Sequence, residues 1–294
     1  DVGSQDLAMG DRQQYLGRIM RCLISDAIDG VMTTPDIMDD LFILNYLYKQ
    51  KGGKSFLDNK ILLGCTNRSG LSGSRYEMDD MITAYSIEDI ERYGLDGAKM
   101  MFRLDLETSQ ARYSQRTIKR CANMIRKCNY YDIPAFIEPL PVERQRDGSY
   151  TVKMDSSELI KTIGVATALG GNSSNIWLKI PYVENYEYVV RSTTNPILML
   201  GGASTGNPTD ILVNFEKGLG AGKNVVGCLL GRNLLYPGHD DPLAVSLAMS
   251  EIIHNNSSTE EAVKTIAGNR GKDMDYLTSK IMGVSLTSKD IGWL

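Results

Sequence analysis

The sequence has few of the residues that mark several large classes of protein. Its 294 residues include two histidines and five cysteines, and no two cysteines form a C-x-x-C pair. So few histidines argue against a zinc centre of the three-histidine type. An odd, scattered set of cysteines argues against a disulfide framework and is typical of a reducing compartment. We therefore expect a cytoplasmic protein.

Long runs of one kind of residue are also absent. Lysine and arginine together number 32, aspartate and glutamate 36, and no sustained basic run predicts a nucleic-acid partner. The longest apolar runs, 197–200 and 225–230, are far shorter than the roughly 18 residues that a membrane-spanning helix needs. Residues 1–14 lack the features of a signal peptide. We expect a soluble protein, and because it begins with Asp1 rather than Met, we expect a preceding segment.

A strand followed by a helix recurs along the chain. Short apolar runs typical of strands buried on both faces begin near residues 28, 61, 98, 133, 176, 196 and 225. Helices are expected over 12–24, 35–49, 79–93, 115–129, 156–169, 184–191, 208–219 and 241–254. No low-complexity linker divides these elements, so we expect one domain over residues 1–294.

This alternation predicts an α/β fold, either an open doubly wound sheet or a closed (β/α)8 TIM barrel. We favour the barrel because loops rich in Gly, Asn and charged residues follow several strands, where barrel enzymes place their active residues. Seven strands are visible and a closed barrel has eight. The first strand is therefore expected to be missing or irregular, at a place before residue 12.

Lys179 is the most unusual side chain of the predicted strands. It stands among large apolar residues in 175–181 (NIWLKIP). One interpretation is a lysine whose stem is buried and whose ammonium reaches solvent. The other is a nucleophile, because desolvation favours the neutral amine, which can attack a carbonyl group and form a Schiff base.

Two further predicted strands carry charges inside apolar runs. Lys99 and Arg103 lie on one face of the strand near 97–105, since strand residues alternate between faces, and Glu138 interrupts the run 133–140. Each of these residues alone is typical of a structural ion pair. A barrel interior that gathers Lys99, Glu138 and Lys179 would instead hold two amines and a carboxylate, which outlines a proton-transfer site.

The last two predicted strands both run into glycine. Residues 198–202 read LMLGG and residues 228–232 read CLLGR. Backbone N–H groups of Gly201, Gly202 and Gly231 could approach an anion closely, and Arg232 could add a charged contact. Glycine at a strand end is also ordinary turn chemistry. Two such ends in succession favour a phosphate-binding site.

The loop after the second visible strand offers weaker candidates. Asn67 and Arg68 could orient a polar substrate, although such loop residues are common. Glu77, Asp79 and Asp80 are interpreted as the solvated start of a helix, where acidic residues are favourable.

Six stretches of the chain resemble the class I aldolase superfamily, which has a TIM-barrel fold. They are 30–37 (GVMTTPDI), 64–71 (GCTNRSGL), 96–100 (DGAKM), 177–181 (WLKIP), 200–202 (LGG) and 231–237 (GRNLLYP). The resemblance covers most of the chain. It is closest to a bacterial aldolase family associated with inositol catabolism, which is similar to deoxyribose-phosphate, tagatose-bisphosphate and archaeal fructose-bisphosphate aldolases.

The resemblance implies a role for several of the residues above. Lys179 corresponds to the Schiff-base lysine, and Gly202 and Arg232 to phosphate ligands. Lys99 and Glu138 resemble the lysine and glutamate that assist proton transfer in the tagatose-bisphosphate branch. Relatives of this type also carry an acidic residue on their first strand, and this sequence is expected to begin at or after that point.

The sequence therefore predicts a class I aldolase that cleaves a phosphorylated ketose or keto-acid by a retro-aldol reaction. The catalytic residues would be Lys179, Glu138 and Lys99, and no metal or other cofactor is required. Substrate-binding candidates are Arg232, Gly201, Gly202, Gly231, Asn67, Arg68 and Arg103. By resemblance, a homo-oligomer is expected. The alternatives are a barrel isomerase or acyl transferase and a non-catalytic phosphate-binding or assembly subunit.

Overall fold

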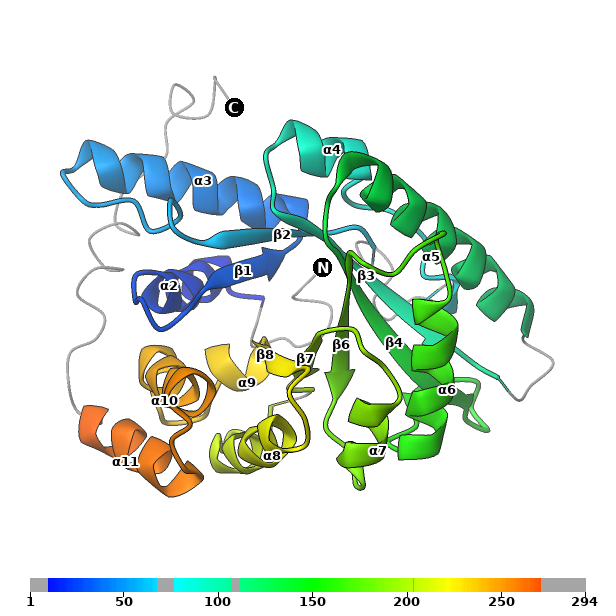
Figure 1. The fold of residues 1–294 in the computed structure, drawn as a ribbon. Coiled ribbons are helices and arrows are strands. Elements are labelled where there is room, and N and C mark those ends of the chain that lie inside the picture. The colour runs from blue at the N-terminus through cyan, green and yellow to red at the C-terminus, as the bar shows by residue number, and fades with distance from the viewer. Residues whose placement is uncertain (1–9, 68–76, 107–110, 203, 271–294) are drawn as a thin grey trace.

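The computed structural model describes residues 10–67, 77–106, 111–202 and 204–270 and has an α/β fold (Figure 1). Seven parallel strands follow one another in the order of the chain except for one short hairpin strand. They are β1 (Gly30–Thr33), β2 (Ile61–Cys65), β3 (Gly97–Leu104), β4 (Ala135–Arg144), β6 (Ile176–Pro181), β7 (Ile197–Leu200) and β8 (Val225–Leu229). The exception, β5 (Tyr150–Val152), pairs antiparallel with the end of β4.

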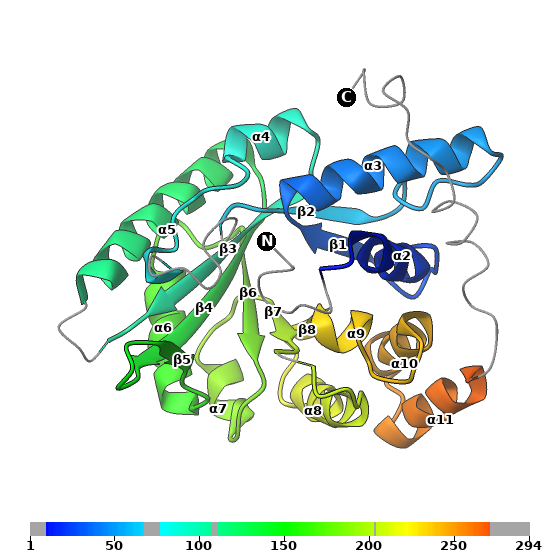
Figure 2. The ribbon, with the colours of Figure 1, turned by 180° about the vertical axis from the view of Figure 1, so that it is seen from behind.

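Helices follow the strands and cover the outside of the sheet, as Figures 1 and 2 show. They are α2 (Arg12–Leu23), α3 (Pro35–Gln50), α4 (Ile87–Arg92), α5 (Ala111–Tyr131), α6 (Ser156–Thr167), α7 (Tyr186–Arg191), α8 (Thr209–Gly220), α9 (Arg232–Leu235), α10 (Pro242–Asn255) and α11 (Thr259–Asn269), with a 3-10 turn η2 (Glu77–Asp79). The parallel strands and the helices that cover them confirm the predicted fold class.

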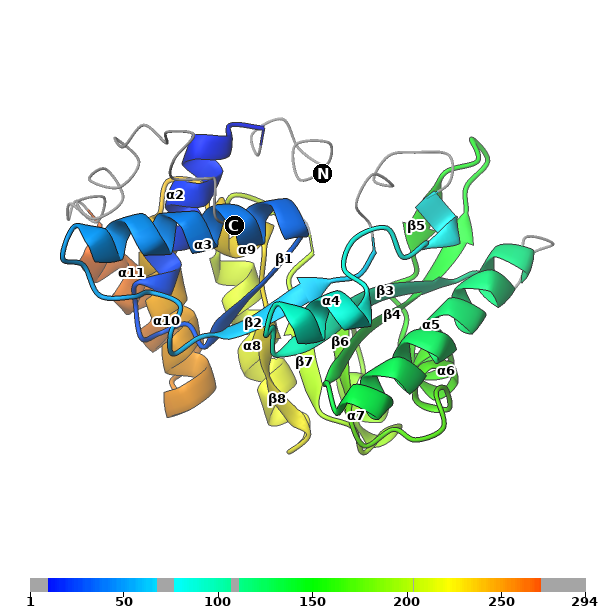
Figure 3. The same ribbon diagram turned by 90° about the horizontal axis from the view of Figure 1, so that it is seen from above.

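The sheet curves into a nearly closed barrel. Within the described ranges β1 pairs only with β2, and β8 pairs only with β7. The helices α2 and α10 lie side by side across the opening between these two edges (Figure 3). The place before residue 12 where the first strand is expected to be missing or irregular falls mainly in residues 1–9, which lie outside the described residues.

Strand alternation divides the side chains between the barrel interior and the helices. Outward-facing residues are fully buried between sheet and helices, and among them are Met100, Ile137 and Leu178. The residues next to them, such as Phe136 and Trp177, face inward. The apolar outer face supplies most of the core, so the interior is free to carry charged groups.

The element boundaries agree with the sequence except in four places. The helix expected over 79–93 is a 3-10 turn followed by α4, which begins only at Ile87 because Ser86 caps it through a capping box with Asp89. The other three are the strand β5 and the helices α9 and α11, which the hydrophobic pattern did not predict. All three are short or peripheral elements.

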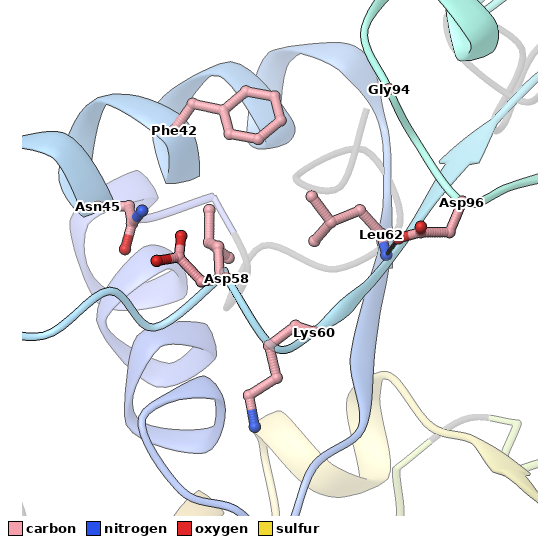
Figure 4. A pocket seen from close by; sticks show the side chains of 8 residues that line it. Phe42, Asn45, Asp58, Lys60, Leu62, Gly94 and Asp96 are labelled. Atoms are coloured by element: carbon pink, nitrogen blue, oxygen red, sulfur yellow. Dashed lines mark hydrogen bonds between the residues drawn. The ribbon is translucent and has the colours of Figure 1, made fainter.

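The structure contains two cavities of note. One of about 740 Å³ extends from the barrel interior to the opening between β1 and β8 and is lined mainly by apolar side chains. A smaller one of about 330 Å³ lies near the amino ends of β2 and β3 (Figure 4). Its polar groups serve the fold, because Lys60 donates to the carbonyls of Ser25 and Ile28 and Asp96 accepts the N–H of Leu62.

Leu178→Ala should strongly destabilise the protein. The side chain is fully buried between β6 and the helices, so its loss leaves a cavity worth about 2–5 kcal/mol of unfolding free energy. Ile61→Ala removes the same number of carbon atoms from a side chain that is 50% exposed and should cost less than about 1.5 kcal/mol. Urea denaturation measures both, and equal losses would contradict the described burial.

Candidate active site

Three charged side chains meet inside the barrel, one from each of three neighbouring strands. Lys99 lies on β3, Glu138 on β4 and Lys179 on β6. The register of β4 with β6 pairs Ile137 with Leu178, so Glu138 and Lys179 follow at the same level. The structure therefore brings together the three side chains that the sequence singled out for chemistry.

Glu138 lies between the two amines. One carboxylate oxygen, Oε2, is 2.7 Å from Nζ of Lys99, and the other, Oε1, is 3.0 Å from Nζ of Lys179. The relative exposure of the three residues is 4% for Glu138, 5% for Lys99 and 9% for Lys179. The cluster is thus a buried set of two cations and one anion, held on adjacent rigid strands.

Burial and charge act in opposite directions on Glu138. Burial alone would raise the pKa of its carboxyl group, but the positive charges of Lys179 and Lys99 outweigh burial and lower the pKa to about 2. Glu138 is therefore ionised at neutral pH and accepts hydrogen bonds. In this state it can take up a proton rather than supply one.

The pKa of Lys179 is lowered from its usual value. Burial is the main cause, and the positive charge of Lys99 adds to it, while the carboxylate of Glu138 opposes both. A larger fraction of this amine is therefore neutral than in an exposed lysine. A neutral amine is the form that attacks a carbonyl group, and a neighbouring carboxylate can take up the proton released.

Lys179 lines the large cavity, together with the aromatic pair Phe136 and Trp177. The two rings stack with centroids 5.6 Å apart and an angle of 29° between their planes. Each stands two residues before a charged member of the cluster on the same strand face, Phe136 before Glu138 and Trp177 before Lys179. The aromatic pair thus forms an apolar layer next to the charges, on the side of the amino ends of the strands.

Polar contacts at the end of β2 fix the backbone of β3. The hydroxyl and the N–H of Thr66 both donate to the carbonyl of Lys99, at 3.0 and 2.8 Å. The amide of Asn67 donates to the carbonyl of Met101 and accepts its N–H, at 2.7 and 2.9 Å. Asn67 is 1% exposed, so its side chain acts as a substitute for strand pairing rather than facing a cavity.

Arg103 forms a buried ion pair with Asp80. A guanidinium nitrogen lies 2.8 Å from one carboxylate oxygen of Asp80, Oδ1, and the other oxygen, Oδ2, accepts the backbone N–H of Arg103. The solvated helix start predicted at Asp79 and Asp80 is wrong, because these residues are 9% and 0% exposed. The sequence did carry a signal for this pairing, since a buried arginine on a strand requires a buried anion.

The glycines after β7 lie beside the carboxyl end of β6, and the glycine after β8 lies one strand farther along, because β7 pairs with both β6 and β8. Gly201 and Gly202 follow β7, and Gly202 has a left-handed backbone with φ of 69°. Gly231 follows β8 and is exposed, and the half-buried Arg232 begins α9. Arg68, the remaining substrate-binding candidate, lies outside the described residues.

Cys65 is a member of this neighbourhood that the sequence did not single out. It ends β2 and pairs in register with Lys99. Burial raises the pKa of its thiol, although the charges of Lys99 and Lys179 oppose the shift.

Over the described ranges, no group of three or more His, Cys, Asp or Glu side chains is arranged to hold a metal ion. Within the same ranges, no helix combines the length and apolar character needed to cross a membrane.

Comparison with solved structures places this fold among aldolases. Cgl0159 of Corynebacterium glutamicum is 31% identical in sequence with a TM-score of 0.74, and the match covers 85% of this chain and 79% of that one. A Schiff base-forming fructose-1,6-bisphosphate aldolase is 20% identical with a TM-score of 0.59, over 84% of this chain and 86% of that one. The second likeness concerns the fold alone.

Comparison with curated sequences gives a partial match. An uncharacterized aldolase of Saccharolobus solfataricus is 29% identical over 148 residues, which is 49% of this chain. The match spans half of the length of that relative. The family described as Cgl0159-like matches residues 1–249. The chain therefore belongs to the Cgl0159-like family, and its barrel is structurally related to those of the Schiff-base fructose-bisphosphate aldolases.

Proposed function

We propose that the chain is a class I aldolase that cleaves a carbon–carbon bond of a phosphorylated ketose or keto-acid through a Schiff base on Lys179. The observation that carries this proposal is the position of Glu138, which lies 3.0 Å from the Lys179 amine and 2.7 Å from the Lys99 amine in a buried site. The structural likeness to a Schiff base-forming aldolase and the sequence match to an uncharacterized aldolase support the same reaction class.

The reaction begins with the neutral amine of Lys179. Its nitrogen attacks the substrate carbonyl carbon, the carbonyl oxygen takes up a proton, and the resulting carbinolamine loses water to form an iminium ion. The neighbouring carbon–carbon bond then breaks, and its electron pair moves to the iminium to give an enamine. The hydroxyl group of the leaving fragment loses its proton and becomes the carbonyl group of the released aldehyde. The enamine is then protonated on carbon, and hydrolysis of the resulting iminium ion releases the ketone and the lysine.

Glu138 moves the protons in this sequence. Because it is ionised in the resting site, it accepts the proton that the attacking amine loses and returns it to the carbinolamine oxygen, which leaves as water. Ionised again, it then accepts the proton of the substrate hydroxyl when the carbon–carbon bond breaks. Lys99 keeps the pKa of Lys179 low through its positive charge and balances the charge of the carboxylate.

We assign substrate binding to the loops at the carboxyl ends of the last strands. Gly201, Gly202 and Gly231 would bind the phosphate group through backbone N–H groups, and Arg232 through its guanidinium group. Arg68 remains a candidate for the polar part of the substrate. Asn67 and Arg103, which already bond to the backbone of β3 and to Asp80, would instead support the site.

The identity of the sugar is a separate part of the proposal. The resemblance to aldolases associated with inositol catabolism points to a phosphorylated deoxy-keto-gluconate as the first substrate to try. Other phosphorylated ketoses of similar length belong in the same screen, because loops that bind a phosphate group discriminate poorly among the sugars attached to it.

Substrate-dependent borohydride trapping should add mass to Lys179. Reduction of the iminium fixes the substrate carbon to Nζ, and peptide mass spectrometry locates it. Lys179→Ala should abolish both the label and cleavage, because no nucleophile remains. Lys217→Ala, at an exposed lysine of α8, should retain both. Cleavage without any label, or a label that survives Lys179→Ala, would refute the imine.

Lys99→Met should move the acid limb of the kcat/KM profile to higher pH. The charge of Lys99 lowers the pKa of Lys179, so its removal raises that pKa, and less neutral amine is present at neutral pH. Lys99→Arg retains a positive charge, so the acid limb of its kcat/KM profile should lie close to that of the wild type. If both variants lose activity with an unchanged pH profile, Lys99 does not tune the amine.

Glu138→Gln should alter how stability depends on pH. The pKa of Glu138 falls from the ordinary glutamate value of 4.5, taken for the unfolded chain, to about 2 in the folded protein. Its ionised form therefore stabilises the fold above pH 4.5, and this contribution is lost as the pH falls toward 2. The variant should therefore show a smaller fall in unfolding free energy over this window. It should also lose about 3–5 kcal/mol at pH 7, because two buried cations remain without a counter-ion.

Glu143→Gln provides the matched control for this measurement. Glu143 lies on the same strand, β4, but is exposed. Its neutralisation should leave the pH dependence of urea denaturation close to that of the wild type. Identical slopes for the Glu138 and Glu143 variants would show that the central carboxylate is not stabilised by the two lysines.

A further inference from the structure

The loops after β7 and β8 are joined to each other by their own side chains and backbone. The amide of Asn233 donates to the carbonyl of Gly201 at 2.6 Å, with a longer contact of 3.4 Å to the carbonyl of Gly202. Farther along both loops, the hydroxyl of Ser204 donates to the carbonyl of Tyr236 at 2.7 Å. Two hydrogen bonds, 32 residues apart in sequence in each case, thus hold one loop against the other.

Close backbone contact adds a third point of attachment. A Cβ atom on Gly238 would lie 2.1 Å from the carbonyl oxygen of Gly206, so only glycine permits this approach. Gly201 is constrained in a similar way, because a Cβ atom there would lie 2.8 Å from Nδ2 of Asn233. Glycine at position 201 therefore makes room for the asparagine amide.

The hydrogen bond to Gly201 also orients the next peptide group. In a trans peptide the C=O and the following N–H point in opposite directions, and no described peptide bond is cis. Binding of the Gly201 carbonyl to Asn233 consequently directs the N–H of Gly202 away from Asn233. Across the described residues, that N–H has no hydrogen-bond acceptor.

The side chain of Asn233 is buried between the two loops that it joins. The residue is 6% exposed, whereas Gly202 of the one loop and Gly231 of the other are exposed. A buried amide that makes a short hydrogen bond to a backbone carbonyl is rigid, and loss of the bond would leave that carbonyl without its partner. The amide thus links the two loops at the end nearest to the strands.

We infer that Asn233 is a positioning residue that holds the loops of Gly201–Gly202 and Gly231–Arg232 together as one phosphate-binding surface. It acts on the backbone of the loops and contacts no part of the lysine and glutamate cluster. The inference rests on the proposed function only in that these loops bind the phosphate group of the substrate. A surface made of two loops binds an anion well only when both are held in place.

Asn233→Ala should weaken the binding of inorganic phosphate, measured by calorimetry, about tenfold, as expected for the loss of one buried hydrogen bond. The KM for a phosphorylated substrate should rise by a similar factor with little change in kcat. Trapping of Lys179 by an unphosphorylated ketone should be unchanged, since that reaction does not use the loops.

Asn195→Ala provides the matched control. Asn195 is also a buried asparagine whose amide donates to two backbone carbonyls, those of Ser173 and Ile176, but it lies at the amino end of the strands. The control should lose stability and keep its affinity for phosphate. If both variants lose affinity equally, or neither loses it, the role of Asn233 is only structural and the inference is overturned.

A second variant covers the case in which Asn233→Ala does not fold. Ser204→Ala removes the other hydrogen bond between the loops with a small change of volume and should also weaken phosphate binding.

Phosphate affinity and imine formation, measured separately, distinguish this inference from the proposed function. If phosphate affinity falls as expected but no imine forms on Lys179, the loop coupling stands and the aldolase proposal fails. If the wild-type chain binds no phosphate, the inference fails, whatever happens at Lys179.

Discussion

The interior of this barrel depends on one carboxylate that lies between two amines. Without Glu138, the ammonium groups of Lys99 and Lys179 would repel each other in a buried site. Without Lys99, the carboxylate would hold the proton of Lys179 more firmly. The cluster keeps its charges only because three adjacent parallel strands present them on the same face, and because the apolar outer face of the sheet supplies stability that the interior does not.

The fold separates the parts of the site by function. The charged cluster lies in the barrel interior, two residues along β4 and β6 from the stacked rings of Phe136 and Trp177. The glycine loops lie at the ends of β7 and β8 and are fixed mainly to each other. Contacts from Thr66 and Asn67 hold β3 at the level of Lys99. The proposed reacting groups and the proposed anion-binding groups are therefore supported by different sets of contacts.

The sequence was informative where one physical rule decides the position of a residue. Strand alternation and the shared direction of parallel strands are enough to bring Lys99, Glu138 and Lys179 to one place. The pairing of Arg103 with Asp80 was not predicted, because Asp80 lies in a loop whose path no local pattern determines. The contact of Asn233 with Gly201 was missed for a similar reason, since glycine after a strand is compatible with a turn, an anion or a close approach.

The stacked aromatic pair gives this site a spectroscopic property. The chain has two tryptophans, Trp177 and Trp293, and Trp177 stands two residues from Lys179 on the same strand face. Its indole ring therefore lies within the electric field of the amine. Conversion of that amine to an iminium adds a fixed positive charge close to the ring, to which the indole π-system is sensitive. Under the proposed mechanism, the intrinsic fluorescence of the protein would therefore report formation of the iminium on Lys179, without an added dye.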